Sequence, residues 1–282
     1  VLRADDTEHP PWATTAEQWW TIVDKADYIA GGFVWTGFDY RGEPTPFARW
    51  PSVSSYFGIM DLCGFPKDNY WYYRAWWRPD EPLVHLLPHW NWTGREGQDI
   101  EVWVHTNCKE GELSLNGRSF GRKTVDRARH VQWSVPFEPG ILEARGIHAD
   151  GSVVQTCRET TGSPVALRLS SDRTRVAADG QDIAIVGLEA VDAQGRLVPD
   201  AAIPFKLTTL GAGHLIGVGN GDPTSHIPAA GPFATTFNGL AQALIRSKSE
   251  VGMIQLSVAS ELAFEGNLAI YSTASERDQL RQ

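Results

Sequence analysis

The sequence is poor in sulfur and in positive charge, and it has no long apolar run. Its three cysteines, Cys63, Cys108 and Cys157, are too few for a disulfide framework and lack metal-like spacing. We therefore expect buried free thiols, with a Cys108–Cys157 pair as the alternative. A formal net charge of −9 leaves no basic stripe to neutralise phosphates, which argues against nucleic acid or an anionic membrane as a partner. No stretch approaches ~18 consecutive apolar residues, so we expect no segment that spans a bilayer.

Tryptophan is absent from the carboxyl-terminal half of the chain. All twelve tryptophans lie at or before Trp133, and this shift predicts at least two units with different roles. Clusters of breaker residues at 78–82 and 160–164 are candidate boundaries. We therefore predict a first segment at residues 1–82, a second at 83–162, a third at 163–275 and a polar tail at 276–282.

The second and third segments show the period-two alternation of β-strands. Ile100, Val102 and Val104 alternate with polar or larger residues, and Asn116-Gly117 is the strongest short-range hairpin signal in the chain. Short strands separated by turns continue to the end of the third segment, at a spacing typical of immunoglobulin-like sandwiches. The predicted fold class is therefore mostly β, with two such sandwiches.

Three histidines, His85, His89 and His105, invite interpretation as a metal site. On a strand, residues i and i+4 share a face but lie ~13 Å apart, which is too far for two ligands to meet. We therefore expect these histidines in a core or at its rim, and no cofactor.

The first segment predicts one helix followed by one buried strand. Residues 16–29 carry apolar side chains at helical spacing. Thr14 or Thr15 can cap this helix, because Glu17 and Gln18 lie three residues further on.

The apolar run at residues 33–38 is followed at once by charged and aromatic residues. This order is typical of a buried parallel strand that delivers a site from its carboxyl end. A parallel barrel needs eight strand–helix units, roughly 250 residues, so the first segment holds only one or two of them. Because residue 1 is Val and no signal peptide precedes it, we expect a processed or cloned piece of a longer protein.

Residues 11–17 (PWATTAE), 32–40 (GFVWTGFDY) and 55–68 (SYFGIMDLCGFPKD) resemble the end of the catalytic barrel of glycoside hydrolase family 2, specifically its β-galactosidases. The likeness continues through residues 85–92 (HLLPHWNW) into the accessory β domains of that family. The resemblance implies two β-sandwiches preceded by the last βα portion of a truncated TIM (β/α)8 barrel. It also implies a retaining enzyme whose catalytic glutamates both precede Val1, so that this chain is inactive alone and contains no catalytic residue.

Five residues of the first segment are candidates for contact with a β-galactoside: Trp12, Trp35, Asp39, Asp61 and Lys67. As the resemblance implies, the indole of Trp35 would form an apolar wall for the sugar, the alternative being a packed core residue. Trp12 would line the outer cleft.

The charged candidates are more ambiguous. Asp61 could accept two hydrogen bonds from sugar hydroxyls, and a solvated loop carboxylate is the alternative. Lys67 could balance that charge or contact a distal sugar. Asp39, like Glu43, is expected to be mainly structural, although Asp39 paired with Glu43 or Asp61 is a weaker alternative for the two acids of a glycosidase.

Two other functions stay open. A β-glucuronidase or β-mannosidase would share the fold, but Asp61 would repel the carboxylate of a glucuronide. A non-catalytic carbohydrate-binding or adhesion module would have no use for a helix–strand unit of barrel type. The sequence leaves open a homo-oligomer and the compartment, whether bacterial cytoplasm, periplasm or outside the cell.

Overall fold

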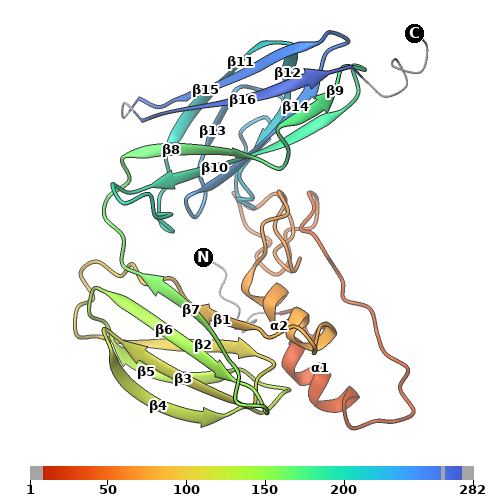
Figure 1. Ribbon diagram of the computed structural model, residues 1–282. Coiled ribbons are helices and arrows are strands. Elements are labelled where there is room, and N and C mark those ends of the chain that lie inside the picture. Colours follow the sequence, from red (N-terminus) through yellow and green to blue (C-terminus); the bar gives the residue numbers. More distant parts are fainter. Residues whose placement is uncertain (1–8, 262–263, 275–282) are drawn as a thin grey trace. The chain divides into compact units, whose positions relative to one another are not determined.

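A computed structural model describes residues 9–261 and 264–274 of the chain (Figure 1). The chain divides between Thr160 and Thr161 into two compact units. Strands dominate both units, which confirms a mostly β fold. The predicted tail at 276–282 lies outside the described residues. In the described part of the chain, neither helix has the length and apolar character needed to cross a membrane.

The first unit combines two helices with two antiparallel sheets, ordered β1-β2-β5 and β4-β3-β6-β7. Apolar side chains of both sheets, Leu86 and Leu113 among them, meet in one core with Trp90. The elements are α1 (Ala16–Val23), α2 (Asp68–Trp77), β1 (Val84–Leu87), β2 (Asp99–Thr106), β3 (Glu110–Leu115), β4 (Arg118–Thr124), β5 (Val131–Pro136), β6 (Ile141–Ile147) and β7 (Val153–Glu159).

The hairpin predicted at Asn116-Gly117 is confirmed. These two residues join β3 to β4, and Leu115 pairs with Arg118 directly across the turn. Their φ angles of 51° and 79° are both positive, as a two-residue turn of this kind requires. The local sequence therefore sets the register of this strand pair.

The second unit contains a four-stranded sheet ordered β12-β14-β10-β8 and a five-stranded sheet ordered β13-β11-β15-β16-β9. One core of buried apolar residues lies between them. The strands are β8 (Ala166–Ser171), β9 (Arg175–Ala177), β10 (Ile183–Val191), β11 (Pro204–Gly211), β12 (Gly213–Gly219), β13 (Phe233–Thr235), β14 (Leu240–Ser247), β15 (Gly252–Ala259) and β16 (Glu265–Thr273).

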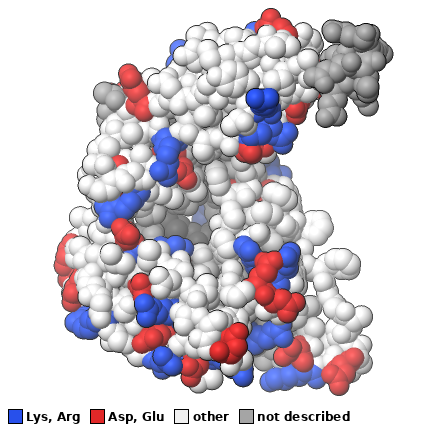
Figure 2. All heavy atoms as spheres, in the orientation of Figure 1, with Lys and Arg blue, Asp and Glu red and all other residues white. Residues whose placement is uncertain are grey.

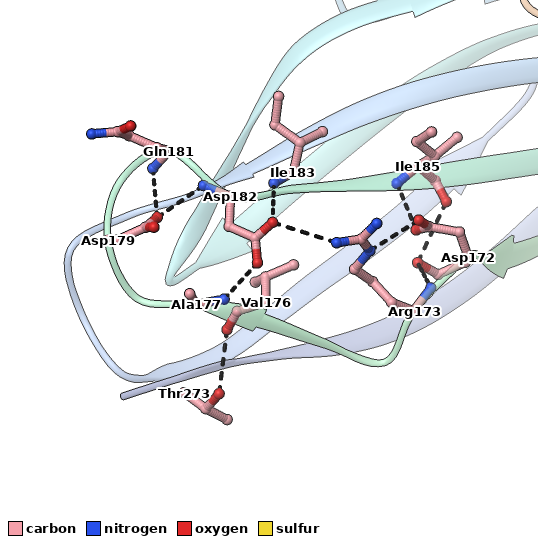
Figure 3. A network of polar contacts seen from close by, with 11 residues as sticks. Asp172, Arg173, Val176, Ala177, Asp179, Gln181, Asp182, Ile183, Ile185 and Thr273 are labelled. Atoms are coloured by element: carbon pink, nitrogen blue, oxygen red, sulfur yellow. Dashed lines mark hydrogen bonds and ion pairs between the residues drawn. The ribbon is translucent and has the colours of Figure 1, made fainter. Parts of the chain in front are cut away.

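Strand β9 is held in place by polar contacts around Asp182 (Figure 3). The Asp182 carboxylate accepts hydrogen bonds from the backbone N–H groups of Ala177 and Ile183, at 2.8 and 2.9 Å. The Arg173 guanidinium bridges Asp172 and Asp182. Strand β9 is short and pairs in parallel with β16, so these contacts add to the few hydrogen bonds that it makes within the sheet.

Helix α1 begins as predicted and ends early. Thr15 accepts a hydrogen bond from the N–H of Gln18 while the Gln18 side chain accepts one from the N–H of Thr15, which completes a capping box. The prediction that the helix continues to residue 29 is wrong, since α1 ends at Val23. A short helix depends on packing of its apolar face, and beyond this point Tyr28 is 89% exposed.

The strand predicted at residues 33–38 is not formed. Between residues 30 and 40 the described chain has one isolated parallel bridge, from Phe38 to Met60. Residues 36–39 share a few backbone hydrogen bonds with residues 59–60, and so short a pairing lacks the further strands that stabilise a sheet. Residues 9–82 therefore show two helices and isolated bridges, and the described residues of this segment form no parallel sheet.

Candidate functional site

A hollow of about 1290 Å³ lies in the first unit, and residues between His9 and Trp77 line it. Of the five predicted sugar contacts, Trp12, Trp35 and Lys67 line this hollow, and Asp39 and Asp61 do not. Glu43, which we expected to be structural, is also part of the lining. Elsewhere, the face seen in Figure 2 carries intermixed charges of both signs.

Trp35 and Trp12 present large aromatic surfaces to solvent. Trp35 is 75% exposed and Trp12 is 85% exposed, although both are among the most apolar side chains of the chain. The Nε1–H of Trp35 donates a hydrogen bond to the Tyr40 hydroxyl at 3.2 Å, and that hydroxyl donates to the Glu43 carboxylate. The indole face itself is available to a ligand.

Asp39 is buried and is fully occupied by internal contacts. One carboxylate oxygen accepts hydrogen bonds from the Ser55 hydroxyl at 3.0 Å and from the Gly58 N–H at 2.8 Å. The other forms an ion pair with Lys67, whose ammonium group also donates to the carbonyl of Tyr56 at 2.9 Å. In this structure Asp39 and Lys67 therefore hold the loop after residue 54.

Gly58 makes this arrangement possible. A Cβ atom at position 58 would lie 2.3 Å from the backbone nitrogen of Asp39, which is closer than real Cβ contacts come. The two backbone segments can approach this closely only because residue 58 has no side chain.

Asp61 stabilises a turn. Its Oδ1 accepts hydrogen bonds from the N–H groups of Cys63 and Phe65, at 2.8 and 3.0 Å. Burial raises the pKa of the Asp61 carboxyl, and these two hydrogen bonds offset only part of that effect. Asp39 paired with Glu43 or with Asp61 was the alternative for the two acids of a glycosidase. In the structure each of these carboxylates has another partner: Asp39 contacts Lys67, Asp61 binds its own turn and Glu43 accepts from Tyr40.

A second group of polar residues lies where the helices meet the sandwich. The expectation that His85 and His105 lie in a core or at its rim is confirmed, but sequence reasoning missed the group that they join. His85 on β1 pairs with His105 on β2. The Nε2 of His85 lies 2.7 Å from Asp68 of α2, and the Nδ1 of His130 lies 2.6 Å from Glu17 of α1. Among the described residues, no group of three or more His, Cys, Asp or Glu side chains is arranged to hold a metal ion.

His105 is the most deeply buried member of this histidine cluster. It is 3% exposed, and neither ring nitrogen has a hydrogen-bond partner. Burial, aided by the neighbouring His85, lowers the pKa of His105 to about 3. The residue types were visible in the sequence, but their separation along the chain gave no sign that they meet.

In comparisons with known proteins, each unit matches one family model. The sequence model of glycoside hydrolase family 2 C-terminal domain 5 matches residues 167–266, and that of a domain of unknown function, DUF4982, matches residues 97–155. Beta-galactosidase BoGH2A of Bacteroides ovatus is 42% identical over 90% of this chain and 30% of its own length. A putative beta-glucuronidase of Formosa agariphila is 32% identical over 92% of this chain and 25% of its own length.

Solved structures show the same relation. A beta-glycosidase from Bacteroides vulgatus matches with a TM-score of 0.86 and 34% identity, over 91% of this chain and 33% of that one. A glycosyl hydrolase family 2 member from Bacteroides cellulosilyticus gives a TM-score of 0.84 at 27% identity, over 92% of this chain and 38% of that one. The chain spans 30% and 25% of the two curated relatives.

Proposed function

This chain carries carboxyl-terminal domains of glycoside hydrolase family 2, and we propose that it is the carboxyl-terminal portion of a retaining β-galactosidase. The observation that carries the proposal is the 42% identity to a beta-galactosidase over 90% of this chain and only 30% of that relative. The remainder of such an enzyme would contain both catalytic carboxylates. This chain would supply one side of the sugar pocket.

The exposed aromatic surface of the hollow supports this proposal. Phe33, Trp35 and Trp12 are large apolar side chains in contact with solvent, and such patches on a soluble protein mark surfaces that another segment or a ligand covers. We assign residues 1–82 to the last βα portion of a TIM barrel, whose missing strands would cover this surface. Residues 83–162 and 163–275 would be accessory sandwiches.

In the complete pocket, Trp35 would be the main contribution of this chain. An indole face suits the apolar C–H face of a pyranose, while carboxylates on other strands bind hydroxyls and perform the chemistry. Hydrolysis with retention needs two carboxyl groups about 5–5.5 Å apart, one as nucleophile and one as acid and base. Asp39, Asp61 and Glu43 are bound to other groups and are poor candidates for that pair.

A β-glucuronidase is the main alternative, because a relative of that putative activity is 32% identical. The charged residues that line the hollow, which are mainly acidic, disfavour a β-glucuronidase. Among the described residues that line the hollow, Lys67 is the only Lys or Arg, and its charge is paired with Asp39. Four lining residues are acidic: Asp24, Asp27, Glu43 and Asp68. This surface would repel the carboxylate of a glucuronide and suits a neutral sugar.

Substrate preference of the full-length enzyme tests the proposal. We expect aryl β-galactosides to be hydrolysed with a higher kcat/KM than the matching β-glucuronides and β-mannosides. Trp35→Ala should lower kcat/KM for the preferred substrate without lowering the melting temperature. A higher kcat/KM for the glucuronide would contradict the assignment.

A further inference from the structure

The Trp35 indole is connected to a carboxylate through one hydroxyl group. Its Nε1–H donates to the Tyr40 hydroxyl at 3.2 Å, and the Tyr40 O–H donates in turn to Glu43. The two hydrogen bonds therefore point the same way, from the indole through the Tyr40 hydroxyl to the Glu43 carboxylate. Nothing in the sequence pattern pointed to this connection, since Tyr40 and Glu43 follow the apolar run as two of several polar residues.

Tyr40 is the fixed member of this chain of hydrogen bonds. Its backbone N–H donates to the Ser55 hydroxyl at 3.0 Å, and its carbonyl accepts from the Ser55 N–H at 2.8 Å. Its ring meets the rings of Trp35 and Phe57 edge to face, with centroids 6.3 and 5.7 Å away. Tyr40 is therefore anchored on both its backbone and its ring.

Trp35 is held much less firmly by packing. With 75% of its surface exposed, few neighbours restrict rotation of its side chain. The hydrogen bond from Nε1 is directional and fixes the indole plane relative to Tyr40. The carboxylate of Glu43 strengthens this arrangement, because a tyrosine that donates to a charged acceptor has more electron density to offer a second donor.

We propose that Tyr40 and Glu43 are positioning residues that hold the Trp35 indole in the orientation in which it contacts the sugar. The proposal rests on the proposed function of Trp35 as the wall of the sugar pocket. A platform that is already oriented does not lose rotational freedom when the sugar binds, so more of the contact energy stabilises the bound state. The hydrogen bond to Glu43 also raises the pKa of Tyr40, as expected for a hydroxyl that donates to a carboxylate.

A double-mutant cycle in the full-length β-galactosidase tests the proposal. Trp35→Phe keeps an aromatic face and removes the N–H donor, and Tyr40→Phe keeps the ring and removes the hydroxyl. We expect Tyr40→Phe to lower kcat/KM by about two- to tenfold, the usual range for one hydrogen bond, with an unchanged melting temperature. In the Trp35→Phe background it should have no further effect.

Substitutions of Glu43 test the proposal independently of the double-mutant cycle. Glu43→Gln retains an oxygen that accepts from Tyr40 but loses the charge, so it should lower kcat/KM less than Glu43→Ala does. Neither change should exceed Tyr40→Phe, because both leave the hydroxyl that accepts from Trp35. Tyr28→Phe is the matched control, because Tyr28 is exposed and lies outside the hollow.

The outcomes separate this proposal from the proposed function. If Trp35→Ala loses activity while Tyr40→Phe has no effect, or has the same effect in the Trp35→Phe background, the positioning role is wrong and the sugar wall stands. Equal losses from Glu43→Gln and Glu43→Ala would overturn the acceptor role of Glu43. If Trp35→Ala keeps full kcat/KM, the sugar wall itself is wrong.

Discussion

Acid should destabilise the first unit through His105, and the structure gives the size of the effect. The ring of His105 is buried, its nitrogens lack partners, and the rings of Tyr72, His85 and His130 surround it at 5.4 to 6.5 Å between centroids. Protonation would place a charge in this site without a hydrogen-bond acceptor. Burial accordingly lowers the pKa of His105 to about 3, from an ordinary value of 6.5.

The sign follows from proton binding. Between pH 6.5 and 3 the unfolded chain binds a proton at His105 that the folded chain does not, so stability falls as the pH falls. From pH 7 to pH 5 this loss amounts to about 2 kcal/mol. Burial also lowers the pKa of His85, which acts in the same direction.

The carboxylates of the cluster act at lower pH. Burial alone would raise the pKa of Glu17 and of Asp68, but hydrogen bonds from His130 and His85 leave both below their ordinary values of 4.5 and 3.8. The stabilisation they provide is therefore present above those values and is lost at more acidic pH. Arg158 of β7 adds a favourable charge near Asp68. The interval from pH 7 to 5 therefore lies above the range in which these two carboxylates act.

Tryptophan fluorescence during urea unfolding is the suitable assay, because all twelve tryptophans belong to the first unit. The wild-type chain should lose about 2 kcal/mol or more of unfolding free energy from pH 7 to 5, and His105→Phe should lose about 2 kcal/mol less. His214→Phe, in the second unit, is the control and should behave as wild type. An unchanged pH dependence in His105→Phe would refute the reasoning.

The same fluorescence assay checks three further predictions at pH 7. Asp39→Ala should cost about 2–3 kcal/mol, because Lys67 would keep its charge in a partly buried site without its partner. Gly58→Ala should cost at least about 2 kcal/mol, since its Cβ would collide with backbone atoms of Asp39; a loss below about 0.5 kcal/mol would count against that close approach. Trp90→Ala should cost about 3–5 kcal/mol by leaving a core cavity, whereas the exposed Trp12→Ala should change stability by less than about 0.5 kcal/mol.

Local signals in the sequence predicted the features that depend on few residues. The capping box at Thr15 and the hairpin at Asn116-Gly117 need only neighbours within a few positions, and both are confirmed. The alternating pattern predicted strands in both units correctly. Each of these strands pairs with another strand of this chain, so the strand that the pattern favours can form. The mostly β fold followed from that pattern.

Features that depend on distant partners could not be predicted. Residues 33–38 have the composition of a buried strand, but in the described part of the chain their pairing is one isolated bridge, from Phe38 to Met60. Asp39 was expected to be mainly structural, but its ion pair with Lys67 joins residues 28 positions apart and was not predicted. The contact between Glu17 and His130 joins residues 113 positions apart, and no local pattern encodes it.

We propose that this chain is part of a β-galactosidase whose catalytic acids lie outside these 282 residues. The most direct measurement compares hydrolysis of a chromogenic β-galactoside by the isolated chain and by the full-length protein at equal concentration. The account predicts turnover by the full-length protein and none above the uncatalysed rate by the isolated chain. Turnover by the isolated chain that disappears on replacing Asp39, Glu43 or Asp61 would contradict it, because the catalytic acids would then lie within these 282 residues.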